Sequence, residues 1–397
     1  MGDENARGGK TALVLGGGIG GIVVANELRR QLASKHRVIV FERTQQHVFA
    51  PSLLWLLIGD RQLDFIRTPL SRLLHAGIEV VYAGVDRIDA QQREVSAAGI
   101  AYRGDALVVA LGAELAPQRV PGLQAAGYNL YTAEGALALR DVLRSFRKGR
   151  IVVLTATPAY KCPAAPYEAA MLIEYECRRN RCRNDVTIDL YAAEPAPMGV
   201  AGPAVSAGVQ ALLQDKSIGY HPGLQVIEVD REARRILFAD NSSAEYDLLA
   251  YVPPHRAPDV VVDAGLTGEG GWVSVDRHTL ETSHPGVYAI GDVTSIPLTM
   301  GKPLPKAGVF AHRQAEVVAH NIAQAWNGRG SALNFDGHGL CFVEIGDGQA
   351  GIGSGNFYAE PVPAVKLRRP SRYRHLLKVL FERIWLRRFP MTWFVRR

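Results

Sequence analysis

The feature that most constrains the fold is a glycine-rich turn between an apolar strand, predicted at residues 11–15, and a helix. The turn fits the spacing G-x-G-x-x-G with Gly16, Gly18 and Gly21. In such a turn the first glycine permits a tight bend, the second lets backbone N–H groups approach a pyrophosphate, and the third lets the helix pack on the strand. The next predicted strand ends at Glu42, 26 residues after Gly16, where a carboxylate can accept hydrogen bonds from a ribose. The pattern predicts a Rossmann-type dinucleotide site.

Two later segments indicate which dinucleotide is bound. Residues 282–293 (TSHPGVYAIGDV) predict an apolar strand ending at Gly291 and Asp292, and residues 107–113 (LVVALGA) predict another, which runs into Gly112. The first segment resembles the second FAD fingerprint of flavoproteins with two dinucleotide-binding domains. The other resembles the strand at which the chain first leaves the FAD domain. This resemblance implies that Asp292 hydrogen-bonds the ribityl chain and that the cofactor is FAD.

A second strand–turn–helix pattern lacks the glycines. The predicted strand at residues 150–158 carries Thr155, Thr157 and Pro158 where a glycine fingerprint is expected. A threonine Cβ crowds an approaching pyrophosphate, and proline lacks an N–H donor. We therefore expect a second Rossmann-like domain that has lost tight NAD(P)H binding. An NAD site with an unusual loop is the alternative.

The four cysteines fall into two groups. Cys162 follows Lys161 at the expected start of a helix, where both the lysine and the helix dipole favour a thiolate. Cys341 lies 179 residues later on a short apolar strand. Cys177 and Cys182 form a C-x4-C pair without the further ligands that zinc requires, so we interpret them as structural and expect no metal site. Cys162 is thus the expected nucleophile.

The segments KCPAAPYEAAML (161–172), PLPKAGVFAHRQAEVVAHNI (303–322) and GLCFVEIG (339–346) together resemble the sulfide:quinone oxidoreductase family. The resemblance implies that Cys162 and Cys341 flank the flavin and relay sulfur, that Glu168 is a general base, and that Lys306 packs beside the pyrimidine end of the flavin. Some members of that family carry a third cysteine between the two domains. Residues 112–157 contain none, so a two-cysteine mechanism is expected.

The C-terminal tail is strongly basic. Residues 366–397 contain eleven Lys or Arg and a single acid, Glu382, which leaves a body with a net charge of about −4. This distribution argues against nucleic-acid binding by the body. Apolar residues recur with helical spacing at positions 376, 377, 380, 381, 384 and 385. A basic amphipathic helix with aromatic residues is suited to a membrane interface, although packing on its own domain or on a partner copy is an alternative.

These observations predict an α/β protein with two Rossmann-like domains of the FAD/NAD(P)-binding type and a C-terminal amphipathic helical segment. The motifs place the FAD-binding domain at residues 1–113 and 284–331. They place the second Rossmann-like domain, with its degenerate nucleotide site, at 114–283. The C-terminal segment, expected to carry the second redox cysteine and the membrane and quinone contacts, covers 332–397.

The expected function is oxidation of sulfide to polysulfide or sulfane sulfur through the cysteine pair, with electrons passed by FAD to a membrane quinone. A single-subunit NADH:quinone oxidoreductase, a flavocytochrome-type sulfide dehydrogenase, or a non-catalytic flavin redox sensor or docking protein are the alternatives. Since no apolar signal segment precedes the first strand, we expect a peripheral protein on the cytoplasmic side of the cell membrane. A homo-oligomer is left open.

Overall fold

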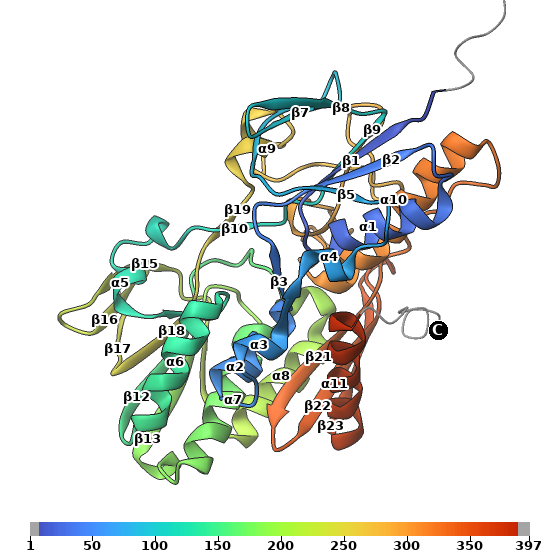
Figure 1. Cartoon of the computed structure of the whole chain (residues 1–397). Helices are drawn as coiled ribbons and strands as arrows, with labels where there is room; N and C mark the ends of the chain where they lie inside the picture. The colour runs from blue at the N-terminus through green and yellow to red at the C-terminus, as the bar shows by residue number, and fades with distance from the viewer. Residues whose placement is uncertain (1–7, 388–397) are drawn as a thin grey trace, which may run out of the picture. The chain divides into compact units, whose positions relative to one another are not determined.

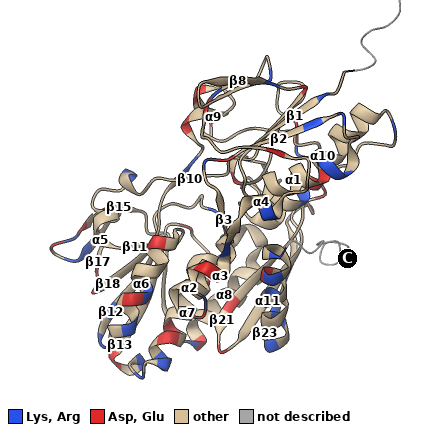
Figure 2. Cartoon of the chain, viewed as in Figure 1, with Lys and Arg blue, Asp and Glu red and all other residues tan. Residues whose placement is uncertain are grey.

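The computed structural model describes residues 8–387 (Figure 1). Among these residues no helix is both long and apolar enough to cross a membrane. Charged side chains occur along most of the helices (Figure 2).

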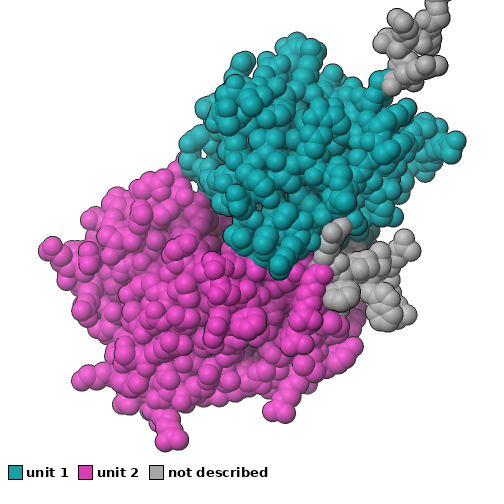
Figure 3. Space-filling view, viewed as in Figure 1, with its two compact units in different colours: residues 1–47, 68–114, 256–337 teal, residues 48–67, 115–255, 338–397 magenta. Residues whose placement is uncertain are grey.

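The chain divides into two compact units, each built from three separate segments (Figure 3). The first unit consists of residues 1–47, 68–114 and 256–337, and the second of residues 48–67, 115–255 and 338–397. Each unit has its own parallel sheet and its own hydrophobic core. This architecture confirms the predicted α/β class with two Rossmann-like cores.

The first unit contains a five-stranded parallel sheet in the order β20-β9-β1-β2-β5. Its strands are β1 (Thr11–Leu15), β2 (Arg37–Phe41), β5 (Glu79–Val81), β9 (Ala106–Val109) and β20 (Val287–Ala289). The three central strands are buried along almost their whole length, as parallel strands covered on both faces are. Also in this unit are α1 (Ile19–Gln31), α4 (Leu70–Leu73), β6 (Val85–Asp89), β7 (Glu94–Ala97), β8 (Ile100–Arg103), α9 (Asp259–Asp263) and α10 (Gly308–Asn327).

The second unit repeats this plan with the sheet order β11-β18-β12-β13-β14. Its strands are β11 (Tyr128–Asn129), β12 (Gly149–Thr155), β13 (Val186–Ala192), β14 (Gly219–Pro222) and β18 (Leu248–Val252). The other elements are α2 (Leu53–Leu57), α3 (Leu63–Ile66), α5 (Leu123–Ala126), α6 (Ala133–Ser145), α7 (Ala165–Arg179), α8 (Pro203–Asp215), β15 (Val226–Asp230), β16 (Arg235–Phe238) and β17 (Ser243–Glu245). Two short two-stranded sheets, β3 (Gln46–Val48) with β4 (Arg67–Pro69) and β10 (Glu114–Leu115) with β19 (His255–Arg256), lie where the chain passes between units.

The C-terminal segment joins the second unit as an antiparallel sheet and a helix. The sheet consists of β21 (His338–Gly346), β22 (Gln349–Asn356) and β23 (Ala364–Ser371), and the helix is α11 (Arg372–Leu386). Ser371 caps α11 by accepting a hydrogen bond from the Arg374 N–H. Strand β21 packs on α7, and α11 packs on β22. The predicted C-terminal helix is therefore present; residues 388–397 lie outside the described residues.

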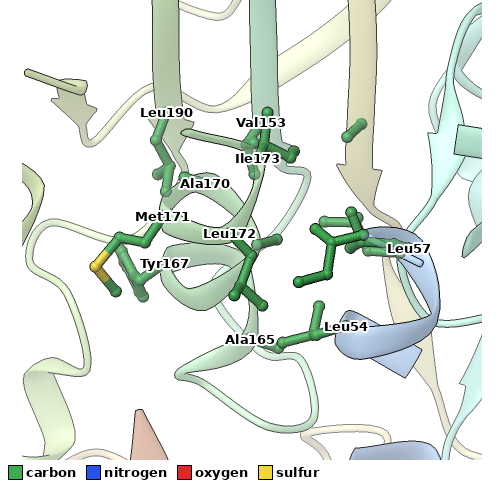
Figure 4. Packing of buried hydrophobic residues seen from close by; sticks show 14 of the residues in the cluster. Leu54, Leu57, Val153, Ala165, Tyr167, Ala170, Met171, Leu172, Ile173 and Leu190 are labelled. Atoms are coloured by element: carbon green, nitrogen blue, oxygen red, sulfur yellow. The ribbon is translucent and has the colours of Figure 1, made fainter. Parts of the chain in front are cut away.

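The division into units differs from the boundaries expected from the motifs. Residues 256–283 belong to the first unit and residues 48–67 to the second, and the described residues from 338 to 387 are part of the second unit rather than a separate segment. Leu54 and Leu57 of α2 point toward α7, whose Leu172 lies in the same core cluster (Figure 4). Such packing between distant segments leaves no local motif, since it depends on apolar residues far apart in the sequence.

Candidate functional site

The glycine turn of the first unit is built as the sequence predicts. Gly16 has a φ of +105°, and a Cβ placed on Gly21 would lie 1.8 Å from the Gly16 carbonyl oxygen. Apart from its two neighbours in the chain, no described residue has an atom within 4 Å of the position that a Cβ on Gly18 would take. The Glu42 carboxylate closes the turn by accepting the Gly17 N–H at 2.7 Å. The close packing at Gly21 and the open space at Gly18 fit a bound pyrophosphate.

The other predicted cofactor residues lie at strand ends of the same sheet. Gly112 follows β9 with a φ of +69° and open space where a Cβ would be. Gly291 has a φ of +73° and donates its N–H to Gln314 Oε1 at 2.7 Å. Asp292 follows in a short 3-10 turn and accepts a hydrogen bond through its carbonyl oxygen from Lys306. These residues and the glycine turn are thus at the carboxyl ends of the strands, where dinucleotides bind in such sheets.

Lys306 is buried at one wall of a pocket in the first unit, which Gly291, Thr294, Ala307 and Phe310 also line. Its Nζ donates to the carbonyl oxygens of Asp292 at 2.8 Å and Thr294 at 2.7 Å.

The same Nζ lies 3.4 Å from the ring centroid of Trp272, a cation–π contact. Burial lowers the pKa of Lys306 to about 8. Trp272 was not identified from the sequence, because it lies in a glycine-rich loop that matches no motif.

The corresponding position of the second unit is filled by its own side chains. Glu194 lies two residues beyond β13, the strand that corresponds to β2, and is buried. Its Oε1 accepts hydrogen bonds from the hydroxyls of Tyr160 and Tyr167, the latter at 2.6 Å, and its Oε2 accepts from Thr155 Oγ1 at 2.7 Å. The carboxylate that could bind a ribose is therefore already satisfied. Of this cluster, the sequence analysis had singled out only Thr155.

Cys162 lies in the turn between β12 and α7 with a φ of +51°, which is unusual for a residue other than glycine. Its carbonyl oxygen accepts the Ala165 N–H at 2.9 Å. The Tyr131 hydroxyl donates to the Lys161 carbonyl oxygen at 2.6 Å and lies 3.3 Å from that of Cys162. These bonds hold the left-handed conformation, whose cost is about 1–3 kcal/mol. Tyr131 was missed by the sequence analysis.

Cys341, on β21, and Cys162 lie close enough to Glu168 for its charge to act on both thiols. Burial, followed by Glu168 and Cys341, raises the pKa of Cys162. Burial and Glu168 raise the pKa of Cys341 to about 12. All four cysteines are free thiols. The structure thus brings together the three residues that the family resemblance assigned to catalysis, although they come from α7, its preceding turn and β21.

The expected stabilisation of a Cys162 thiolate by its neighbours is wrong. The Lys161 Nζ lies over the Tyr131 ring, 5.8 Å from its centroid. The lysine that does favour the thiolate is Lys378, and its effect is smaller than those of burial and Glu168. Lys161 therefore does not favour the Cys162 thiolate, and burial, the largest effect on this thiol, raises its pKa.

Glu168 lies in the first turn of α7 and is buried. Its Oε1 accepts hydrogen bonds from the Glu344 N–H at 2.8 Å and from Lys378 Nζ at 3.0 Å. Burial raises the pKa of Glu168, and Lys378 opposes this rise. A buried carboxyl group beside two thiols is suited to accept and release their protons.

Lys378, one of the basic residues of the C-terminal helix, is buried. Its Nζ lies 4.9 Å from the Trp55 ring centroid. Burial lowers the pKa of Lys378, but the nearby charges of Glu168 and Glu344 outweigh this effect and raise the pKa.

Glu382, on the same side of α11, binds Ser52 and Arg61. The buried face of α11 therefore carries an ammonium and a carboxylate, each with a partner.

The two remaining cysteines lie in the core away from this arrangement, whereas His255 contacts it through the Tyr131 ring. Cys177 and Cys182 are buried in the hydrophobic core at the end of α7, where the Cys182 thiol lies 3.5 Å from the Cys177 carbonyl oxygen. His255 is buried, with its Nδ1 2.8 Å from the Pro253 carbonyl oxygen and its ring against Tyr131.

Comparison with known proteins gives a consistent result. A model of the family described as pyridine nucleotide-disulphide oxidoreductase matches residues 10–325. The sulfide-quinone reductase of Aquifex aeolicus is 26% identical over 395 residues, covering 95% of this chain and 90% of that protein. The mitochondrial sulfide:quinone oxidoreductase of Mus musculus is 24% identical over 371 residues, covering 88% and 79% respectively.

Among solved structures, the crystal structure of the sulfide:quinone oxidoreductase from Aquifex aeolicus superposes with a TM-score of 0.85. The two chains are 24% identical, and the match covers 96% of this chain and 92% of that one. The two proteins therefore share a fold.

Proposed function

Since the chain belongs to the pyridine nucleotide-disulphide oxidoreductase family and is an FAD-dependent oxidoreductase, we propose that it oxidises sulfide and reduces a quinone. The observation that carries this proposal is the grouping of Cys162, Cys341 and the buried Glu168 within the second unit. Two thiols beside one carboxyl group can take up a sulfur atom and handle the protons that its oxidation releases.

The residues of the first unit fit FAD. The turn at Gly16, Gly18 and Gly21 would receive the pyrophosphate, Glu42 the ribose, and Asp292 the ribityl chain. Gly112, Gly291 and Lys306 would line the path of the flavin. When bound there, FAD supplies a two-electron acceptor that can be reoxidised by a quinone.

The proposed sulfur chemistry begins from an oxidised Cys162–Cys341 bridge. Hydrosulfide attacks one sulfur of the bridge, the S–S bond breaks, and one cysteine becomes a persulfide while the other leaves as a thiolate. A second hydrosulfide removes the outer sulfur as hydrogen disulfide, the shortest polysulfide, and returns the persulfide to a thiol. The thiolate left by the first step takes up a proton from solvent, and formation of the bridge from the two thiols then releases two electrons and two protons. Glu168 is the group that accepts protons from the thiols.

The second unit supports a donor other than a nicotinamide. Glu194 is occupied by three hydroxyl donors, and Thr155 replaces a glycine of the fingerprint at the end of β12. A ribose would have to displace Tyr160 and Tyr167 from a buried carboxylate. Leaving a buried charged group without its partners costs more than about 1–3 kcal/mol for each lost bond.

The exposed side of α11 supports attachment to a membrane, from which a lipid-soluble quinone would enter. Leu376 is 62% and Leu380 46% exposed, and Tyr373 lies on the same stripe. Arg383 and Arg387, which are both exposed, continue the same helical spacing toward the end of the helix. An exposed apolar stripe that ends in arginines is suited to an anionic lipid surface.

Anaerobic reduction of the flavin tests the proposed function. Sulfide is expected to bleach the visible absorbance of the holoenzyme, and a soluble quinone to restore it. Cys162→Ser and Cys341→Ser are expected to abolish the bleaching, whereas Cys182→Ser, away from the thiol pair, retains it. Bleaching by NADH together with indifference to sulfide would instead identify an NADH:quinone oxidoreductase.

A further inference from the structure

A row of ionisable side chains leads away from the thiol pair inside the second unit. Glu168 Oε1 accepts the Lys378 Nζ at 3.0 Å, and the same Nζ lies 3.9 Å from Glu344 Oε1. His375 Nδ1 lies 3.1 Å from both carboxylate oxygens of Glu344. Each group from Glu168 to His375 is therefore within hydrogen-bonding reach, or nearly so, of the next one.

The burial of these side chains changes along the row. Glu168 and Lys378 are buried, and Glu344 is 1% exposed. The His375 side chain is 25% exposed. The row therefore begins at a carboxyl group whose charge acts on both thiols and ends at an imidazole that solvent can reach.

Stability does not explain the outer part of this row. Glu168 alone gives Lys378 a partner, so a second buried carboxylate is not needed to neutralise the ammonium. Buried ion pairs are often replaced by apolar residues without loss of stability, because desolvation of the charges offsets their attraction. An apolar pair at positions 344 and 375 would serve to hold α11 on β21 equally well.

We infer that Lys378, Glu344 and His375 form a proton path that connects Glu168 with solvent and that His375 is its outer relay. The inference deepens the proposed function, because it says where the protons go that leave the two thiols.

The transfers balance as follows. When the bridge forms, each thiol loses a proton and the pair loses two electrons, which leave through FAD. The Glu168 carboxylate takes up a thiol proton. Lys378 gives a proton to Glu344 and regains one from Glu168, and Glu344 passes its proton to His375. His375 releases the proton to water, and the row returns to its starting state after each transfer.

Charged and aromatic groups from three elements, β21, α11 and α2, surround His375. Strand β21 contributes Glu344, and α11 itself contributes Lys378 and Arg374, which binds the Arg369 carbonyl oxygen. Helix α2 contributes the Trp55 ring, whose centroid lies 5.6 Å from that of His375. The Arg61 guanidinium also lies over the Trp55 ring, and it forms an ion pair with Glu382.

Proton release from the reduced holoenzyme tests the path without sulfide. Thiols reduced beforehand with a phosphine are oxidised by ferricyanide in a stopped-flow instrument, and a pH-indicator dye reports protons reaching the solution. In the wild type, protons are expected to appear together with the oxidation. In His375→Ala they are expected to appear about tenfold later or more, and added imidazole is expected to restore the rate. His338→Gln, an exposed histidine on β21, is the matched control.

Prompt proton release in His375→Ala, or a delay that imidazole does not shorten, would overturn the inference. Glu344→Gln keeps the shape of the side chain and gives a second test, in which a delay without imidazole rescue is expected because the break lies further inside. Sulfide-driven bleaching is recorded on the same samples. If His375→Ala shows the delay but the wild type does not react with sulfide, the proton path is supported and the proposed function is wrong.

Discussion

Lys378 Nζ of α11 donates a hydrogen bond of 3.0 Å to Glu168 of α7, which lies 210 residues earlier in the chain. Both side chains are buried. The pair attaches the last described helix to the first turn of the helix that follows Cys162. The electrostatic environment of the thiols therefore depends on a segment that lies at the other end of the second unit's sequence.

Replacement of Lys378 by methionine is expected to lower the free energy of unfolding by about 3–5 kcal/mol, because Glu168 would remain buried without its partner. Denaturant unfolding followed by fluorescence measures the change. The double variant Glu168→Gln/Lys378→Met is expected to recover most of the loss. Lys366→Met, at an exposed position of β23, serves as the control and is expected to unfold like the wild type. Equal stability of Lys378→Met and the wild type would contradict the role of this pair.

Glu168→Gln is expected to speed alkylation of both Cys162 and Cys341 by iodoacetamide at neutral pH. Burial and then the Glu168 charge raise the pKa of these thiols, so that removing the charge lowers the pKa and increases the thiolate fraction. Mass spectrometry of the reduced protein over a range of pH measures the rate at each cysteine. Cys177, whose pKa burial and Cys182 raise to about 12, is the internal reference. A slower reaction in the variant would show that the sign is wrong.

FAD binding is expected to weaken as the pH rises through about 8. Burial lowers the pKa of Lys306 to about 8, so its ammonium is present below this pH and lost above it. The charge favours an electron-rich cofactor beside it, and this contribution disappears with the proton. Fluorescence of released FAD measures the effect. Lys306→Met is expected to bind more weakly at pH 7 and to show no change across this range; an inflection near pH 8 that persists in the variant would exclude Lys306 as its source.

Tyr160→Phe is expected to lower the free energy of unfolding by about 1.5–3 kcal/mol, because it removes a donor from the buried Glu194 carboxylate. The variant is not expected to oxidise NADH, since Tyr167 and Thr155 still occupy the same carboxylate. Urea unfolding and an NADH oxidation assay check both outcomes. Tyr373→Phe, at an exposed tyrosine, is the control. NADH oxidation that begins with Tyr160→Phe would mean that this tyrosine alone closes the site.

Leu376→Asp/Leu380→Asp is expected to abolish sedimentation with vesicles that contain anionic lipid. The substitutions place two charges on the exposed stripe of α11, where they oppose insertion into the lipid interface. Sedimentation at low and high salt separates the apolar contribution from the ionic one. Sulfide-driven bleaching with a soluble quinone is expected to persist, which would show that the variant is folded. Undiminished sedimentation of the variant would assign attachment to another surface.

The sequence by itself determined the Rossmann-like cores and the cofactor turn. Gly16 is required by its positive φ and Gly21 by its close approach to the Gly16 carbonyl oxygen, both within one strand–turn–helix unit, and Glu42 is one residue beyond the strand that pairs with β1. Because these requirements are local, they appear as fixed spacings in the sequence. Cys162, Cys341 and Glu168 were identified through the family resemblance, and spacing alone gave no reason to join residues of α7 and β21.

Only the tertiary structure decided the environment of the thiols. Helical periodicity groups Leu376 with Leu380 and Lys378 with Glu382, but it does not say which group contacts the protein. The structure buries Lys378 and Glu382 because Glu168 forms an ion pair with the first and Arg61 with the second, both from other segments of the chain. In the same way Lys161, the neighbour in sequence, lies over Tyr131, and Lys378 takes the place expected for it. A buried charge is placed by the partners that neutralise it, and these partners lie far apart in the sequence.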